Sequence, residues 1–296
     1  MDRLDRMALF ARIVESGSFA RAARDLGVAR STATEALKVL EAEVGARLLV
    51  RTTRHVAPSP EGQEFYYRAR TILSEVEEAY STFQDNTPRG HLRLNASGVL
   101  TRAFIVPRLS EFMAQYPQLS LEFGQTDRLV DLVREGVDCV IRVGAPEDNS
   151  LMLRRLGALT EITCASRAYL EAHGVPKSID DLDGHQMVGF VSSRSGEVLP
   201  LEFQRDGRTE TRRIPARVTT DNSDTAAALA AQGFGLLQAP RYRFEAQLAA
   251  GTLVELLPET PPEPLPINAI YPGSRQMCRR LDVFLAWATV VFEQAR

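Results

Sequence analysis

Residues 30–41 read RSTATEALKVLE and place hydroxyl and cationic side chains at helical spacing. If the stretch is a helix, its inner face is apolar and carries Ala33, Leu37 and Leu40. Its outer edge then carries Arg30, Ser31, Thr34 and Lys38. Hydroxyls and cations on one exposed edge can contact the phosphates and base edges of duplex DNA. The alternative is an ordinary solvated face, so the surrounding elements must decide between the two.

Charge is unevenly distributed along the chain. The whole chain has a formal net charge of −3, with 35 Lys and Arg against 38 Asp and Glu. Residues 21–55 instead hold seven Lys or Arg and four acids, a local excess of +3. A cationic region on an acidic protein indicates an anionic partner for one part of the molecule only.

Helical patterns on either side of a tight turn, followed by two extended runs, would position these side chains. Ser18 is a good N-cap for the helix before the turn, because its hydroxyl can accept from a first-turn amide. Gly27 ends that helix and permits the turn. The runs 48–50 and 55–57 then flank RTTR as a small hairpin would. This order predicts a winged helix-turn-helix.

Residues 59–86 predict one long helix. Ser59 precedes Pro60, and proline is tolerated at the first helical position. Apolar positions then step by four and three residues, at Phe65, Ala69, Ile72, Val76, Ala79 and Phe83. Such a stripe packs either on its own domain or against a second chain. We favour dimerisation, because a long helix between two domains has little else to lie against.

Strand-like and helix-like stretches alternate from residue 91 to residue 296. This rhythm predicts mostly parallel sheets covered by helices. The segment is longer than the ~150 residues of an ordinary domain, so we expect two lobes. Ligands of such sheets bind beyond the carboxyl ends of the strands, where loops and helix N-termini converge.

Several classes of function are disfavoured. The three cysteines are far apart, and the four histidines have no metal spacing. GFGLLQ lacks the third glycine of a dinucleotide loop, and no GxSxG elbow is present. No stretch approaches the ~18 consecutive apolar residues of a membrane span, and the N-terminus lacks the apolar core of a secretory signal. We expect a cytoplasmic protein that is not an enzyme and has no metal, cofactor or membrane partner.

The N-terminal residues resemble the LysR-type transcriptional regulators of bacteria. Many spaced positions agree with the family pattern at once, namely Phe10, Val14, Gly17, Ser18, Phe19, Ala22, Ala23, Leu26, Leu40, Glu41, Gly45, Leu48, Leu49 and Arg51. The stretches 127–144, 164–174 and 248–258 are also similar to the family. The resemblance therefore covers essentially the whole chain.

This resemblance implies an α/β protein with three parts. They are a winged helix-turn-helix (1–58), a linker and dimerisation helix (59–87) and a two-lobed α/β effector domain resembling periplasmic binding proteins (88–296). The chain would cross between the lobes twice, which gives lobe one about 91–162 and 266–296 and lobe two about 163–265. The implied function is a sequence-specific DNA-binding transcriptional regulator that responds to a small-molecule effector. Its implied partners are double-stranded promoter DNA, a second copy of itself in a homodimer or homotetramer, and RNA polymerase.

The expected DNA contacts combine the third helix with the helix before it and with the wing. They are Ser18, Arg30, Ser31, Thr32, Thr34, Glu35, Lys38, Arg51 and Arg54. Three positions depart from the family pattern. Ala29 replaces the usual Ser, so Ser31 is expected to cap the helix, and Ser59 must cap the linker helix. Glu35 replaces the usual Arg and would either read a cytosine amino group or weaken binding.

The same resemblance places the effector between the lobes. The expected lining is Ser97, Gly98, Thr101, Thr126, Arg142, Val143, Gly144, Asn222 and Ser223. Ser97 and Asn222 head helices whose free amides can hold an anion, and Arg142 would add a positive charge. We therefore predict a small organic carboxylate. The alternative is that Ser97 and Asn222 only cap their helices.

Two other functions would fit the second half of the chain. It could be a small-molecule binding protein or an α/β enzyme without a DNA role. A pure binding protein would not need the first 60 residues, and the absence of the catalytic motifs named above disfavours an enzyme.

Overall fold

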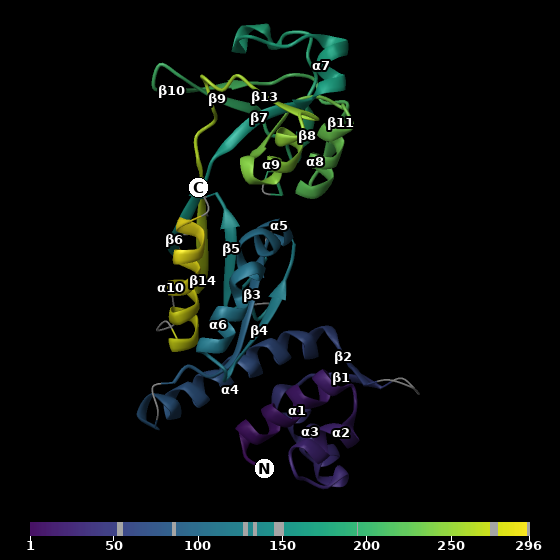
Figure 1. Cartoon of the computed structure of the whole chain (residues 1–296). Helices are drawn as coiled ribbons and strands as arrows, with labels where there is room; N and C mark the ends of the chain where they lie inside the picture. Colours follow the sequence, from purple (N-terminus) through teal and green to yellow (C-terminus); the bar gives the residue numbers. More distant parts are fainter. Residues whose placement is uncertain are drawn as a thin grey trace.

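The computed structural model describes residues 1–51, 56–84, 87–126, 130–132, 135–144, 151–193, 195–272 and 278–294. An N-terminal helical unit, a long helix and two α/β lobes follow one another along the molecule (Figure 1). Arg54 lies outside the described residues, as do the side chains of Arg51 and Phe83.

Three helices and a hairpin form the N-terminal unit. They are α1 (Arg3–Ser16), α2 (Phe19–Asp25), α3 (Arg30–Val44), β1 (Leu49–Arg51) and β2 (Val56–Pro58). Phe10, Ile13 and Ala22 are fully buried in its core. Ser18 accepts from the amide of Arg21 at 3.3 Å and begins α2, as predicted. The two strands pair antiparallel and begin one residue later than the sequence suggested.

The helix α4 (Pro60–Gln84) has 25 residues and lies below lobe one in the view of Figure 1. Ser59 begins it, since its hydroxyl accepts from the amide of Gly62 at 2.9 Å and donates to the carbonyl of Arg47 at 2.6 Å. The capping role expected of Ser59 is therefore confirmed. Gly62 is so close to the hairpin that a Cβ there would stand 1.8 Å from the carbonyl oxygen of Leu48.

Lobe one is a five-stranded sheet with the order β4-β3-β5-β14-β6. Its elements are β3 (Gly90–Ala96), α5 (Gly98–Leu100), the π-helix η1 (Thr101–Ile105), the 3₁₀ turn η2 (Val106–Arg108), α6 (Leu109–Gln115), β4 (Leu119–Gly124), β5 (Cys139–Val143), β6 (Leu151–Leu159), β14 (Leu265–Pro272) and α10 (Arg279–Glu293). Phe112, Phe284 and Phe292 are almost fully buried in one core between this sheet and its helices. The C-terminal elements β14 and α10 thus belong to the lobe that contains β3.

Lobe two contains three small sheets, ordered β12-β7-β13, β11-β8 and β10-β9. Its elements are β7 (Glu161–Ser166), α7 (Arg167–His173), η3 (Ile179–Leu182), β8 (Val188–Phe190), β9 (Leu201–Arg205), β10 (Arg208–Arg212), β11 (Val218–Thr220), α8 (Ser223–Ala231), β12 (Leu237–Pro240), η4 (Arg241–Arg243), α9 (Glu245–Ala249) and β13 (Leu253–Leu256). Two apolar clusters, around Phe203 and Phe244, hold the lobe together.

The sheets are mixed, so the prediction of mostly parallel sheets is wrong. β3 pairs parallel with β4 and β5, and β8 pairs parallel with β11. β14 is antiparallel to β5 and β6, and both neighbours of β7 are antiparallel to it. The reason is the double crossing between lobes, because β14 re-enters lobe one from the opposite end. Among the helices of the described segments, none has the length and apolar character needed to cross a bilayer.

Candidate DNA-binding surface and candidate effector site

The outer edge of α3 faces solvent. Beneath it Ala33, Leu37 and Leu40 are at most 3% exposed. On the outer side Thr34 is half-buried, and the exposed residues are Arg30, Ser31, Thr32, Glu35 and Lys38. At helical spacing Arg30, Ser31, Thr34, Glu35 and Lys38 share one face, whereas Thr32 falls at its margin. The structure therefore brings five of the six predicted α3 contacts together.

Two of these side chains are paired with each other. Lys38 Nζ lies 3.3 Å from Glu35 Oε2, and both side chains are about two-thirds exposed, at 67% and 69%. An exposed helical pair of this kind is worth at most about 1 kcal/mol. Lys38 and Glu35 can therefore separate at small cost, each toward a partner of its own.

The start of α3 corrects one expectation. Ser31 lies inside the first turn, and the N-cap is Ala29, which makes no side-chain hydrogen bond. Ala29 is the last residue with extended backbone before the helix, so only a side chain at position 29 has the geometry to cap it. The helix therefore lacks the roughly 1 kcal/mol that a serine cap typically contributes.

Glu41 connects α3 to the hairpin. Its Oε1 atom accepts from the amides of Leu48 at 2.8 Å and Leu49 at 3.2 Å. Both leucines are buried, at 0% and 7% exposure, so solvent is a poor substitute for the carboxylate. The neighbouring Leu40 fills the core. The Leu-Glu pair at the end of α3 thus fixes the wing relative to the helix.

Replacing Glu41 by alanine should speed hydrogen exchange at the amides of Leu48 and Leu49 by roughly 10–100-fold. Two buried amides would lose their acceptor, at a cost of about 1.5–3 kcal/mol. Glu41→Gln keeps a carbonyl oxygen and should retain most of the protection. Unchanged exchange in Glu41→Ala, measured by NMR or mass spectrometry, would contradict this role.

Ser18 and the wing residues differ in what they can offer DNA. Ser18 is half-buried, and its hydroxyl is engaged in capping α2. Arg51 ends strand β1, and Arg54 lies outside the described residues. The backbone thus carries Arg51 to the wing beside α3, whereas the contribution of Arg54 stays a prediction.

The apolar stripe of α4 does not form a single surface. Phe65 packs against Phe10 of α1 with tilted rings whose centroids are 5.6 Å apart, and Ala69 is fully buried within the chain. Further along, Ile72 and Ala79 are exposed, and Val76 is half-buried. The first part of the stripe therefore packs on its own N-terminal unit, and only the later part can meet a second chain.

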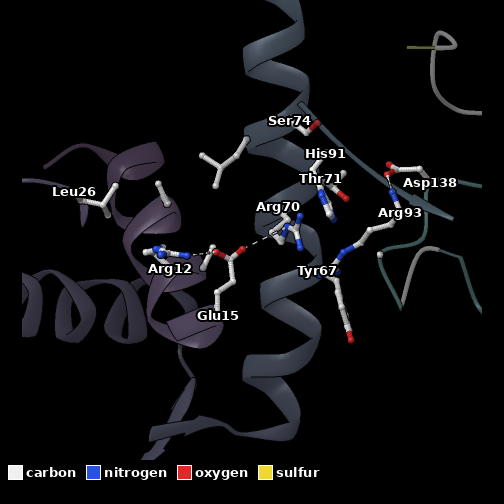
Figure 2. A pocket seen from close by; sticks show the side chains of 14 residues that line it. Arg12, Glu15, Leu26, Tyr67, Arg70, Thr71, Ser74, His91, Arg93 and Asp138 are labelled. Carbon is white, nitrogen blue, oxygen red and sulfur yellow. Dashed lines mark hydrogen bonds and ion pairs between the residues drawn. The ribbon is translucent and has the colours of Figure 1, made fainter. Parts of the chain in front are cut away.

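A pocket of about 280 Å³ lies where α1, α4 and lobe one meet. Figure 2 shows Arg12 and Glu15 reaching in from α1, Arg70 from α4, and Arg93 from the side of lobe one. The lobe packs closely here, because a Cβ on Gly136 would lie 2.7 Å from the ring of Tyr67. The N-terminal unit, the linker helix and the effector half thus share one junction.

Tyr66 is the centre of this junction. Its hydroxyl is 3.2 Å from Glu15 Oε1, and it accepts from Arg70 at 3.1 Å and Arg93 at 3.4 Å. Burial raises the pKa of Tyr66, so the hydroxyl stays protonated and donates a hydrogen bond to Glu15. Arg93 also lies over the rings of Tyr66 and Tyr67, at 5.7 and 5.6 Å from their centroids. Polar contacts therefore run without a break from strand β3 to helix α1.

The predicted effector residues of lobe one follow the carboxyl ends of three adjacent strands. Ser97 and Gly98 follow β3, Thr126 follows β4, and residues 142–144 end β5. Because β4, β3 and β5 are parallel neighbours, these positions meet at one edge of the sheet. We call this edge, together with the start of α8, the interlobe site.

Individual side chains at the interlobe site are held in different ways. Arg142 Nη2 donates to Asn95 Oδ1 at 2.8 Å. Thr101 is 1% exposed, and its hydroxyl donates to the carbonyl of Ser97. Its side chain therefore stabilises the start of the π-helix. Thr126 is half-buried, and Val143 is 36% exposed. The polar groups best placed for a ligand are therefore Arg142 and the residues around Gly98.

Asn222 and Ser223 begin α8 on the opposite lobe. Asn222 Oδ1 accepts from the amide of Thr225 at 2.9 Å, so Asn222 caps the helix. Ser97 makes no such bond, and the helix after it has only three residues. The two helix starts therefore differ, and only Asn222 performs the capping considered for both.

Sequence reasoning missed the residues that join the two lobes. Arg102 of η1 is 2.7 Å from Asp224 of α8, and the rings of Phe104 and Tyr242 are 4.7 Å apart. Arg102 and Asp224 are direct neighbours of the predicted residues Thr101 and Ser223. A cation beside one predicted lining residue and an anion beside another could have indicated an ion pair between the lobes.

Glu161 stands at the crossing from lobe one to lobe two. It is half-buried, begins β7 and pairs with Pro240. Burial, and then the neighbouring charge of Glu202, raise the pKa of Glu161 to about 7. Between about pH 4.5 and 7 the folded chain holds a proton on Glu161 that the unfolded chain has lost. The free energy of unfolding therefore falls as the pH rises through this window.

Glu161→Gln should stabilise the protein at pH 8 and leave it almost unchanged at pH 5. The glutamine removes a charge that is costly above pH 7, a gain on the order of 1–3 kcal/mol. Thermal unfolding at both pH values measures it, with exposed Glu171→Gln as control. Equal effects of Glu161→Gln at pH 5 and pH 8 would contradict the raised pKa.

Comparison with known proteins gives consistent matches along the chain. Residues 4–63 match the family described as bacterial regulatory helix-turn-helix protein, lysR family, and residues 85–292 match the LysR substrate binding domain. The chain is 34% identical over 296 residues to the uncharacterized HTH-type transcriptional regulator YhjC of Escherichia coli K12, covering 99% of each. It is 31% identical to an HTH-type transcriptional repressor of Pseudomonas aeruginosa, covering 99% of this chain and 93% of that one. The solved structure of CrgA, a LysR-type transcriptional regulator from Neisseria meningitidis, has 29% identity and a TM-score of 0.60 over 97% of both chains.

Proposed function

The chain belongs to the LysR family of bacterial transcriptional regulators, and we propose that a small organic acid between its lobes controls how it binds operator DNA. It is a DNA-binding regulator with an effector-binding domain. The observation that carries the DNA assignment is α3, whose apolar face is buried and whose opposite edge is exposed and polar. We propose that residues 1–58 are the DNA reader, 59–87 the linker and 88–296 the effector domain.

In this proposal α3 enters the major groove, which is wide enough for one helix. Arg30 and Lys38 contact guanine or phosphate, and Ser31 and Thr34 contact bases or phosphates. Glu35 accepts from a cytosine amino group after Lys38 turns away from it. We propose that Ser18, Thr32, Arg51 and Arg54 contact the DNA beside this face.

A homodimer, or a homotetramer built from two of them, would place two readers on one operator. We propose that the exposed later part of α4, around Ile72, Val76 and Ala79, forms the contact between chains. Phe83 continues the same stripe in the sequence. We also propose that the regulator works in the cytoplasm, contacts RNA polymerase at its promoter and performs no catalytic step.

The strand β3 links the effector site to the reader. Its residue Arg93 lies in the junction with Tyr66, and its end leads into Ser97 and Gly98 at the interlobe site. A change at the interlobe site can therefore alter the position of one rigid strand against α4 and α1. We propose this junction as the route by which the effector changes DNA binding.

An anionic effector is favoured by the groups that converge on the interlobe site. Arg142 supplies a cation from β5, and Asn222 heads α8, whose N-terminus favours negative charge. We propose that a small carboxylate contacts both. The remaining proposed lining residues are Ser97, Gly98, Thr101, Thr126, Val143, Gly144 and Ser223.

Thermal-shift measurements with small carboxylic acids test this assignment. A bound acid should raise the melting temperature of the wild type, and Asn222→Ala should remove more than half of that rise. Ser178→Ala, which removes a cap elsewhere in lobe two, should leave the rise unchanged. Stabilisation that ignores Asn222→Ala would place the acid at another site.

A further inference from the structure

Among the residues that the structure describes, an ion pair and an aromatic pair connect the two lobes. Arg102 Nη2 lies 2.7 Å from Asp224 Oδ2, although the two residues are 122 positions apart in sequence. Two residues further along the same π-helix, Phe104 meets Tyr242 edge-on at 4.7 Å. Figure 1 shows this region, where α5 of lobe one lies opposite α8 and α9 of lobe two. The ion pair therefore spans the boundary at which we place the effector.

Arg102 is placed where a ligand carboxylate is expected. A Cβ on Gly98 would lie 3.0 Å from Arg102 Nη1 and 3.0 Å from Gln125 Oε1. Arg102 Nη1 thus lies near the carboxyl ends of β3 and β4, while Nη2 donates to Asp224. A planar guanidinium binds one carboxylate best through two N–H groups at once, so a ligand here competes with Asp224.

The exposure of the pair makes exchange of partners easy. Arg102 and Asp224 are 58% and 55% exposed, and ion pairs this accessible contribute little free energy. A ligand carboxylate with additional contacts to the site can therefore outcompete Asp224.

Asp224 keeps a partner when Arg102 leaves it. Arg243 Nη2 lies 3.2 Å from Asp224 Oδ1 and donates to the carbonyl of Ser223 at 2.6 Å. The Arg243 side chain is only 7% exposed, so it is fixed in lobe two. When a ligand displaces Asp224 from Arg102, Asp224 therefore stays paired with Arg243 of its own lobe.

We propose that Asp224 is an internal counter-ion of Arg102 that an anionic effector displaces, so that Arg102 becomes a specificity-determining contact for that effector. This inference rests on the proposed function of the interlobe site, and it adds a residue and a regulatory step. Breaking the Arg102–Asp224 bridge loosens the lobes, while Phe104 and Tyr242 remain as the pivot. Uncharged analogues of the effector lack the group that replaces Asp224.

The bridge itself is tested by the distance between the lobes. Spin labels at Ala114→Cys on α6 and Ala172→Cys on α7 sit on exposed positions of the two lobes, in a Cys278→Ser background. Diluting labelled full-length protein with unlabelled protein restricts the signal to one chain. Asp224→Asn and Arg102→Gln should each raise the population of molecules with the longer label-to-label distance, relative to those with the shorter one, about two- to five-fold. Arg241→Gln, which breaks an exposed pair within lobe two, should not.

Displacement is tested by titrating acetate, succinate and benzoate, each beside its uncharged amide. An acid that binds the wild type should bind Asp224→Asn two- to five-fold more tightly and Arg102→Gln at least ten-fold more weakly. The affinity of each amide should be the same for both variants as for the wild type. Weaker binding to Asp224→Asn would overturn the proposal, as would distances unchanged by that variant. Failure of all three acids to change the wild-type distances would overturn displacement by a carboxylate.

The two proposals can fail separately. An acid whose affinity ignores Asn222→Ala contradicts the location of the effector site, whatever the distances show. Distances that ignore Asp224→Asn contradict the bridge, even where the acid binds at Asn222.

Discussion

Replacing Gly62 by alanine should unfold the N-terminal unit or destabilise it by about 3 kcal/mol or more. Alanine is ordinarily better than glycine within a helix by about 1 kcal/mol, so the clash must reverse the sign. The new Cβ would stand 1.8 Å from the carbonyl oxygen of Leu48. That carbonyl cannot retreat, because it accepts from the amide of Ser59 at 3.0 Å while Ser59 also holds Arg47. Circular dichroism during urea unfolding should show the loss, together with loss of DNA binding.

The neighbouring exposed residue supplies the control for this experiment. Glu61→Ala lies on the same first turn of α4 and should change stability by no more than about 0.5 kcal/mol. A Gly62→Ala protein with wild-type stability would mean that α4 does not pack on the hairpin in this way. The wing would then lack the support that the structure gives it.

Replacing Lys38 or Thr34 by alanine should reduce the preference for operator over random duplex by roughly 5–150-fold. Each removes a side chain from the groove face of α3, and one good base contact contributes about 1–3 kcal/mol of discrimination. Stability should barely change, because Lys38 is exposed and the Thr34 hydroxyl donates to the carbonyl of Arg30 within the same helix. Fluorescence anisotropy with both duplexes gives the ratio directly.

A matched loss of charge elsewhere separates base reading from general electrostatics. Arg208→Ala removes an exposed cation from β10 in lobe two and should leave the operator preference unchanged. If both α3 variants keep the wild-type preference, α3 does not read the groove with this face.

Local features of the sequence predicted the parts of the fold that depend on local physics. The caps at Ser18 and Ser59, the turn at Gly27 and the apolar stripe of α3 arise from residues within a few positions of one another. The exposed edge of α3 followed from that stripe, since a helix that buries one side must show the other. The capping predicted for Ser31 was wrong because α3 begins two residues earlier, with Ala29 as its N-cap, and side-chain type alone does not decide a helix boundary.

Contacts between distant segments were not available from spacing. The antiparallel direction of β14 depends on the chain returning from lobe two, and no local pattern encodes that path. Phe65 and Ala69 fit a heptad stripe equally well whether they meet α1 or a second chain. The Arg102–Asp224 bridge requires two lobes to face each other, so only the folded structure brings these charges together.

The central claim is that the N-terminal unit reads duplex DNA, and a salt titration of full-length protein tests it most directly. Anisotropy with duplex from the region upstream of its gene should show affinity at least ~10³-fold above random sequence at physiological salt. The logarithm of the binding constant should fall linearly with the logarithm of salt, at a slope of roughly −4 to −8 for two readers on DNA phosphates. Equal affinity for both duplexes, or no binding to either at 50 mM salt, would contradict the account.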